Sequence, residues 1–312
     1  MERLNTVSRL CLAALAVFVL LAAPAFAGLI GGDLYISGVG GMFPDVAYNS
    51  VSDNYLVVWG DYSLSPMGVS GRLVSSDGAI AGSQSRISET SAYAVMPSVA
   101  YNSTDNEYLV VWIDQRGGDL IYGRRVSAAG APVGASFQIS SSPQSLCAVA
   151  WSSGSNCYYV TYYGGGNTEV TGRRVSIVGG TPVLGAELNI SNNPGYSGYP
   201  DVCYASTGNQ FLVSWEQEDT PDVGRIVGQR VSASSGALLG SLINLTAAGG
   251  RSRACIAYDS VNSRWLVQFN DSTHPGNSVD QYGQLADTNG GLVGSDFAIA
   301  ASPDMELSLI HI

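Results

Sequence analysis

The chain has 312 residues, of which 46% are hydrophobic and 12% are charged, and this composition predicts an ordered protein with a core and excludes intrinsic disorder. Its 38 glycines, its two histidines and its lack of lysine indicate many tight turns and a largely uncharged polar surface. The formal net charge of −11 argues against a nucleic-acid partner, because phosphate contacts need clustered Lys and Arg.

The first 27 residues have the organisation of a secretory signal peptide. Arg3 and Arg9 give a basic start, an apolar stretch covers residues 10–21, and residues 25–27 read Ala-Phe-Ala, a small-x-small cleavage site. A membrane anchor is the weaker alternative, because the apolar stretch is short for a span, and no later segment is apolar enough. We therefore expect a protein without a transmembrane segment after cleavage, which is secreted, held at the cell surface or kept in the periplasm.

From residue 44 the chain repeats one phrase five times. The phrase reads Pro-Asp-Val-Ala-Tyr-Asn, then Tyr-Leu-Val-Val-Trp, then Gly-Arg-Leu-Val-Ser, and its first aromatic returns after 53, 50, 53 and 54 residues. A period near 50 is typical of a repeat architecture. The anchors are Tyr48, Tyr101, Trp151, Tyr204 and Tyr258, and the copies cover residues 44–96, 97–146, 147–199, 200–253 and 254–300.

The second copy shows what each repeat builds. It predicts four short strands, over residues 97–101, 108–112, 121–127 and 137–140, which polar turns join into an antiparallel meander. The second strand is apolar on both faces, and because burying one such side chain stabilises by roughly 1.5–3 kcal/mol, we expect a sheet packed on each side. The predicted wedge between adjacent sheets consists of Trp59, Trp112, Tyr162, Trp215 and Phe269.

Four-stranded repeats of this length predict an all-β fold, a β-propeller of antiparallel blades with five complete blades visible. The phrase Pro-x-Val-Ala-Tyr-Asn, followed by Tyr-Leu-Val-Val-Trp-x-Asp and Gly-Arg-Arg-Val-Ser, resembles secreted bacterial β-propeller repeat proteins, most of them uncharacterised, over residues 44–300. The resemblance implies the fold and not a reaction. A β-helix or another solenoid is the main structural alternative, although its rungs usually need shorter repeats.

Both ends of the repeat region lead us to expect a ring of six or more blades. Residues 32–37 match the fourth-strand ending at 136–140, so the mature chain is expected to begin with a fourth strand that lacks its three partners. At the other end, residues 307–312 break the repeat and can be back-translated to the mosaic-end adapter of transposase-based sequencing libraries. We interpret them as an artefact that follows a propeller domain over 28–306; a genuine tail is the alternative.

One face of the predicted propeller carries the candidate ligand-binding residues. Because strand direction alternates, the turns after each second strand and the crossings between copies should emerge on the same face. The candidates are the carboxylates Asp61, Asp114, Glu216, Asp219 and Asp271, which follow second strands, and the crossing residues Tyr93, Tyr196 and Tyr199.

Two interpretations of these carboxylates stay open. An Asp after a strand commonly accepts hydrogen bonds from turn amides and shapes the hairpin, and a variant of this idea pairs Asp114 with Arg124. Alternatively, the carboxylates and tyrosines bind a cation or a glycan, because sugars favour aromatic faces flanked by hydrogen-bond acceptors. We predict an extracellular binding module for glycans or for another surface protein, with a glycan-active hydrolase that uses rim carboxylates as the alternative.

Other chemistry has little support in the sequence. His274 lies in a loop and no serine has a nucleophile elbow, so no catalytic residue is assigned. No Cys or His pair has zinc-site spacing, so no metal or cofactor is predicted; calcium is left open, although no Asp-x-Asp-x-Asp-Gly loop occurs. The oligomeric state stays undetermined. We expect four buried free thiols: Cys147 and Cys157, whose strand positions lie beyond bridging distance, and Cys203 and Cys255, which occupy first strands of neighbouring copies and are not clearly in reach of each other.

Overall fold

The structure is a computed structural model that describes residues 34–38, 40–89, 91, 93–164, 168–193, 195–218, 220, 223–273 and 279–300. Residues from Tyr35 onward form one compact unit. This unit is built from β-strands joined by turns, and one short 3-10 helix is the only helical segment among the described residues. In the same part of the chain, no helix is long and apolar enough to cross a membrane.

Each repeat forms one four-stranded antiparallel sheet whose strands follow one another in chain order. The first sheet contains β1 (Gly41–Asn49), β2 (Asn54–Asp61), β3 (Gly68–Ser75) and β4 (Ile80–Arg86). The second contains β5 (Ala94–Asn102), β6 (Glu107–Asp114), β7 (Leu120–Ser127) and β8 (Pro132–Gln138), with η1 (Gln115–Gly117) between β6 and β7. The third contains β9 (Leu146–Ser152), β10 (Cys157–Gly164), β11 (Glu169–Val178) and β12 (Thr181–Asn189). The fourth contains β13 (Tyr196–Ala205), β14 (Gln210–Glu218), β15 (Gly224–Ser232) and β16 (Leu238–Asn244). The fifth contains β17 (Arg251–Asp259), β18 (Arg264–Asp271), β19 (Asp280–Asp287) and β20 (Leu292–Ala300).

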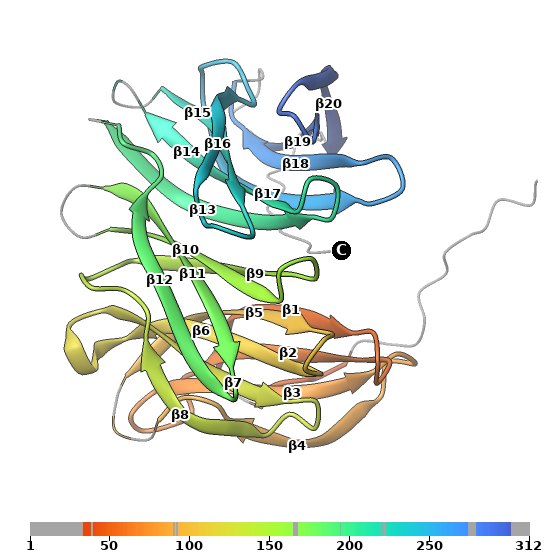
Figure 1. The fold of residues 1–312 in the computed structure, drawn as a ribbon. Helices are drawn as coiled ribbons and strands as arrows, with labels where there is room; N and C mark the ends of the chain where they lie inside the picture. Colours follow the sequence, from red (N-terminus) through yellow and green to blue (C-terminus); the bar gives the residue numbers. More distant parts are fainter. Residues whose placement is uncertain are drawn as a thin grey trace, which may run out of the picture. The chain divides into compact units, whose positions relative to one another are not determined.

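The predicted all-β propeller of four-stranded antiparallel blades is confirmed. Figure 1 shows the five sheets following one another from the orange first sheet to the blue fifth sheet. The first strands begin earlier than the sequence indicated: β5 starts at Ala94 and not at Pro97. The ladder crosses the proline, which has no N–H to donate, because a β-bulge shifts the register between Val95 and Ser98.

A hydrophobic core lies between successive sheets. Between the first two sheets, Leu56 and Ile87 pack in one cluster with Tyr108, Val110 and Trp112. The second strand of a sheet therefore has an apolar side chain on each face, as its sequence requires. The five residues of the predicted wedge all lie buried in the second strands, and they are Trp59, Trp112, Tyr162, Trp215 and Phe269.

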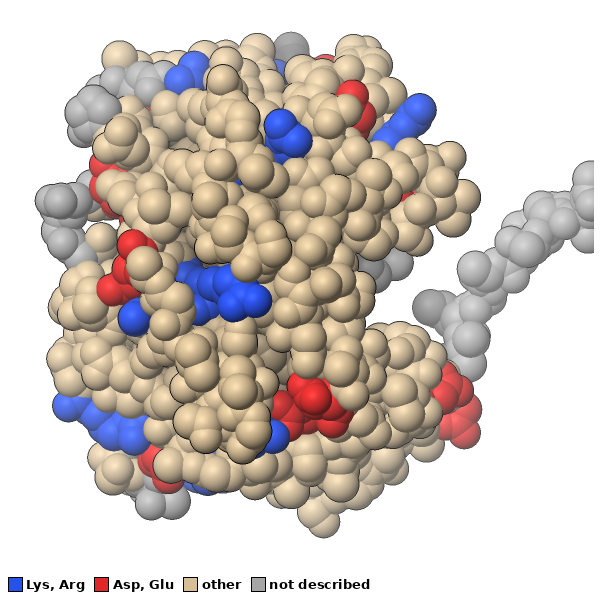
Figure 2. Space-filling model, in the orientation of Figure 1, with Lys and Arg blue, Asp and Glu red and all other residues tan. Residues whose placement is uncertain are grey.

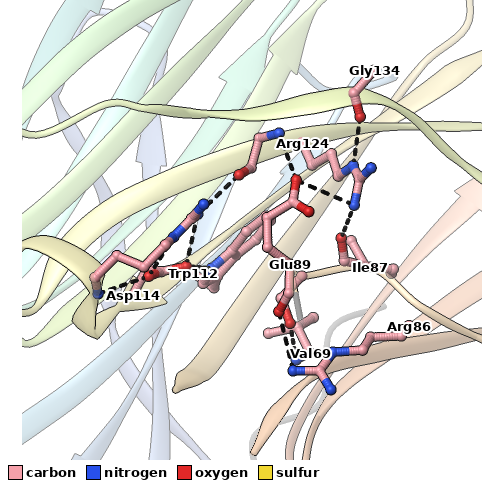
Figure 3. A network of polar contacts seen from close by, with 11 residues as sticks. Val69, Arg86, Ile87, Glu89, Trp112, Asp114, Arg124 and Gly134 are labelled. Carbon is pink, nitrogen blue, oxygen red and sulfur yellow. Dashed lines mark hydrogen bonds and ion pairs between the residues drawn. The ribbon is translucent and has the colours of Figure 1, made fainter. Parts of the chain in front are cut away.

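Arginines of the third strands β7 and β11 tie the second and third sheets to the sheet before each of them. Arg124 Nε donates to Gly134 O in its own sheet (2.8 Å), and Arg124 Nη1 donates to Ile87 O at the end of the preceding sheet (2.9 Å). Figure 3 shows both bonds. The same backward bond joins Arg173 Nη1 to Ile139 O (2.5 Å) and Arg72 Nη1 to Ile36 O (3.3 Å).

Candidate functional site

The turns after second strands and the crossings between repeats lie close together at the same ends of the sheets. Gln115 N, in the turn after β6, donates to Tyr93 O in the crossing before β5 (3.0 Å). Ser197 N, near the start of β13, donates to Thr168 O in the turn before β11 (2.9 Å). Each of these bonds joins a turn after a second strand to a crossing, and the individual contacts of each sequence-predicted candidate decide what it can do.

Asp114, at the end of β6, is bonded on both oxygens inside its own sheet. Its carboxylate accepts from Trp112 Nε1 (2.9 Å) and from Arg116 N (3.0 Å), and it pairs with Arg116 Nε (2.9 Å). The Arg124 guanidinium faces Glu89 instead, at 3.6 Å from Nη1 to Oε1, so Asp114 does not pair with Arg124 (Figure 3). The contacts of Asp114 are those of a residue that caps η1 and shapes the turn.

Asp61 and Asp271 have the same kind of contacts. Asp61 accepts from Ser63 N (3.0 Å) and from Ser70 Oγ (2.8 Å). Burial acts to raise the pKa of the Asp61 carboxyl, but the hydrogen bonds from its neighbours outweigh burial and lower the pKa. Asp271 accepts from Thr273 N (2.8 Å), and its other oxygen pairs with an arginine of β17 (3.0 Å). These carboxylates are engaged by their own sheets.

Three tyrosines from two sheets meet where β10 ends and β13 begins. Tyr163 of β10 packs edge-on against Tyr196, with ring centroids 6.2 Å apart, and its centroid lies 5.6 Å from that of Tyr199. All three rings are half-buried. Half-buried tyrosines combine a fixed apolar face with a polar tip, which is the character of aromatic residues at binding surfaces.

A β-bulge sets the direction of the two crossing tyrosines. The register of β13 against β14 shifts between Gly198 and Asp201, and Tyr199 within the bulge has φ +50°. A bulky residue in this left-handed region is an outlier, and bulges beside functional sites often re-aim a side chain. Glycine at position 198 leaves room for the Tyr196 side chain, because a Cβ at this position would overlap the Tyr196 hydroxyl.

Glu216 and Arg253 complete the group, which we name the tyrosine cluster: Tyr163, Tyr196, Tyr199, Glu216 and Arg253. The Glu216 side chain on β14 is buried, and its Oε2 accepts from Arg253 N on β17 (3.3 Å). The Arg253 guanidinium lies over the Tyr199 ring, 5.1 Å from its centroid. The cluster thus joins the third, fourth and fifth sheets.

Electrostatics in the tyrosine cluster favour neutral side chains. Burial raises the pKa of the Glu216 carboxyl, the nearby Glu218 adds to the rise, and Arg253 opposes it. Burial is also the main cause that raises the pKa values of Tyr163 and Tyr196, and the Glu216 charge adds to both. Buried acids with a raised pKa concentrate at functional sites, because a fold gains no stability from them.

The eight sequence-predicted ligand residues divide into two groups. Tyr196, Tyr199 and Glu216 come together in the tyrosine cluster, where sequence reasoning missed Tyr163 and Arg253. Tyr93 is exposed in the crossing before the second sheet and does not join them. Asp61, Asp114 and Asp271 do not join them either, and Asp219 lies outside the described residues.

A signal for Tyr163 exists in the sequence, one position before the recurring aspartates. Glu216 directly follows the wedge residue Trp215, so the position equivalent to Asp61, Asp114 and Asp271 in the fourth copy is Gln217. The position directly after the wedge differs among the copies, being small or apolar in the first two and polar in the last three. It is filled by Gly60, Ile113, Tyr163, Glu216 and Asn270.

The tyrosine cluster contains no histidine and no cysteine side chain. Among the described residues, no group of three or more His, Cys, Asp or Glu side chains could hold a metal ion. His274 belongs to the residues that the structure does not describe. The four cysteines among the described residues are free thiols; Cys147 and Cys157 are buried, and Cys203 and Cys255 are half-buried.

Replacing Glu216 with glutamine is expected to raise the free energy of unfolding at neutral pH. The carboxyl titrates near pH 4.3 when the chain is unfolded, and burial raises its pKa in the folded protein. The charge therefore opposes folding increasingly as pH rises through the raised pKa, and this cost is absent below about pH 4. Urea unfolding of both proteins between about pH 4 and 8 checks this; a constant difference in stability would contradict it.

The visible surface is mostly uncharged, in agreement with the 12% of charged residues in the sequence. On the face that Figure 2 shows, most residues are uncharged, and arginine and acidic side chains form small separate groups. A polyanion would need a continuous basic tract. The described part of this face carries no continuous basic tract.

Comparisons with known proteins were informative only at the level of structure. No family model matches the chain, and no curated protein matches it. A protein of unknown function from Dyadobacter fermentans is similar, with TM-score 0.58 and 8% identity over 83% of this chain and 82% of that one.

Two carbohydrate-active enzymes also have a similar structure. A GH43 β-1,3-galactosidase solved with galactodeoxynojirimycin has TM-score 0.54 and 8% identity over 84% of this chain and 96% of that one. An exo-β-1,3-galactanase from Phanerochaete chrysosporium has TM-score 0.51 and 12% identity; the matched region covers 83% of this chain and 66% of the enzyme chain. At such low identity these likenesses show a shared propeller-type fold.

Proposed function

We propose that this protein is a secreted or cell-surface β-propeller that binds glycans at the tyrosine cluster. One observation carries the proposal: three half-buried tyrosines, a buried carboxyl and an exposed guanidinium meet where the third, fourth and fifth sheets join. Tyrosine rings can stack on the apolar face of a sugar, while Glu216 and Arg253 can accept from and donate to its hydroxyls. The predicted signal peptide over residues 1–27 would bring this site to extracellular glycans.

The fold supports a role with glycans in general. Structures with the same fold include a GH43 β-1,3-galactosidase and an exo-β-1,3-galactanase, so the propeller is a scaffold on which galactose-containing glycans are handled elsewhere. A fold alone does not transfer a reaction, because unrelated functions share it. The tyrosine cluster is the part of this chain with the chemistry to recognise a sugar.

Binding is favoured over hydrolysis by the number and placement of carboxyls. Glycosidases place two carboxyls on opposite sides of the scissile bond, roughly 5–9.5 Å apart. The tyrosine cluster contains one carboxyl, that of Glu216, whereas such a mechanism needs two; the other carboxyl at this end of β14, Glu218, is not a member of the cluster. The raised pKa of the Glu216 carboxyl, suited to a general acid, is the observation that keeps a hydrolase as the second candidate.

A glycan array probed with the mature protein tests the proposal, with β-1,3-galactan oligosaccharides among the probes. We expect binding to a defined set of glycans without release of reducing ends from them during prolonged incubation. Release of reducing ends, abolished by Glu216→Gln, would establish the hydrolase instead. Neither binding nor release across the array would contradict both candidates.

A further inference from the structure

The fifth sheet leaves uncovered an apolar position that the other four sheets cover. The position is the isoleucine or leucine at the end of the fourth strand or directly after it, and in the first four sheets the sheet that follows packs over it. It is 0% exposed at Ile87 and Ile139, 4% at Ile190 and 1% at Leu245. At Ile299, the equivalent residue of the fifth sheet, it is 48% exposed.

The first sheet shows the complementary feature on its opposite side. Tyr55 of β2 is 37% exposed, and it lies beside Tyr48, with ring centroids 5.1 Å apart. The aromatic residues equivalent to Tyr55 are at most 1% exposed, because a preceding sheet packs over each of them; these are Tyr108, Tyr158, Phe211 and Trp265. The chain therefore carries two free joining faces, one on its first sheet and one on its fifth.

The residues before β1 show what fills the place next to the first sheet. Ile36 lies where the preceding sheet would end, because its carbonyl accepts from Arg72 Nη1 just as Ile87 O accepts from Arg124 Nη1. The sequence agrees, since Ile36-Ser37 corresponds to Ile87-Ser88. A residue in this place belongs to the fourth strand of a sheet whose other three strands are not among β1–β20, because those twenty strands already pair in five complete sheets.

We infer that one further four-stranded sheet of the same repeat lies between the fifth and first sheets, with the segment around Ile36 as its fourth strand. Three more strands of the same polypeptide form the rest of this sheet. One of its faces covers Ile299, and its other face covers Tyr55. The two free joining faces match the two halves of the junction that the chain builds four times, so a sheet with the repeat's own pattern fits both at once.

Equivalent serines provide a ruler for the test. Ser50, Ser103, Ser153 and Ser260 are exposed and occupy the same place in the turn after the first strand of the first, second, third and fifth sheets. Each can be changed to cysteine and spin-labelled in the full gene product, with the half-buried Cys203 and Cys255 replaced by alanine. Dipolar EPR distances for the pairs 50/103 and 50/153 then calibrate one junction and two junctions.

We expect the 50/260 pair to give the distance of the 50/153 pair in a protein whose molar mass by light scattering is that of a monomer. A distance equal to that of the 50/103 pair would mean that the first and fifth sheets join directly, which overturns the inference. A two-junction distance in a dimer would overturn it as well, because a second copy would supply the sheet. None of these outcomes depends on glycan binding.

Discussion

Replacing Tyr199 with glycine is expected to lower glycan affinity at least tenfold, which is about 1.4 kcal/mol of binding free energy. The change removes one ring of the tyrosine cluster and the aromatic face under the Arg253 guanidinium, 5.1 Å away. It suits the backbone, because Tyr199 has φ +50° and glycine adopts that conformation without strain. Titration calorimetry with the best ligand of the array, together with urea unfolding, measures both effects.

The second sheet offers a matched control for this substitution. Met96 occupies the equivalent bulge position with φ +51°, outside the tyrosine cluster. We expect Met96→Gly to leave glycan affinity unchanged and both variants to remain folded, because the backbone gain of glycine offsets part of the lost packing. Equal losses in the two variants, or full affinity in Tyr199→Gly, would contradict the assignment of the site to the tyrosine cluster.

The fold follows from the sequence because the determining pattern is local and occurs five times. A doubly apolar second strand between polar turns specifies a sheet that needs neighbours, and the wedge residues Trp59 to Phe269 lie buried in such strands. Five concordant copies average out the ambiguity of any one of them. Even the backward bond of the third-strand arginines recurs, at Arg72, Arg124 and Arg173.

The tyrosine cluster could not be assembled from the sequence in the same way. It takes Tyr163 from the third sheet, Tyr199 and Glu216 from the fourth and Arg253 from the fifth, so no single sheet contains its pattern. Its geometry depends on a β-bulge that turns Tyr199 toward the preceding sheet, and the bulge has no sequence signature beyond the following proline. The recurring aspartates occupy equivalent positions in the repeats and are therefore visible in the sequence, whereas the tyrosine cluster lies where the repeats differ.

Replacing Asp114 with alanine tests whether the recurring aspartates stabilise the fold or bind the ligand. We expect this change to lower the free energy of unfolding by about 3 kcal/mol while glycan affinity stays the same. Removing the Asp114 carboxylate leaves the buried Trp112 Nε1 without its acceptor at 2.9 Å and the Arg116 guanidinium without its ion-pair partner. It also removes the N-cap of η1. Urea unfolding and calorimetry on the same preparations separate the two quantities.

Asp114→Asn serves as the control, because an amide oxygen still accepts from Trp112 Nε1 or Arg116 N and only the charge is lost. Its destabilisation should be about 1 kcal/mol, smaller than that of alanine. If either variant bound glycans tenfold more weakly while remaining as stable as the wild type, Asp114 would belong to the ligand site. The site would then extend around the face along the recurring aspartates, and the tyrosine cluster would be one part of it. If stability falls while affinity stays unchanged, recognition is confined to the junction of the third, fourth and fifth sheets, where burial raises the pKa of the Glu216 carboxyl.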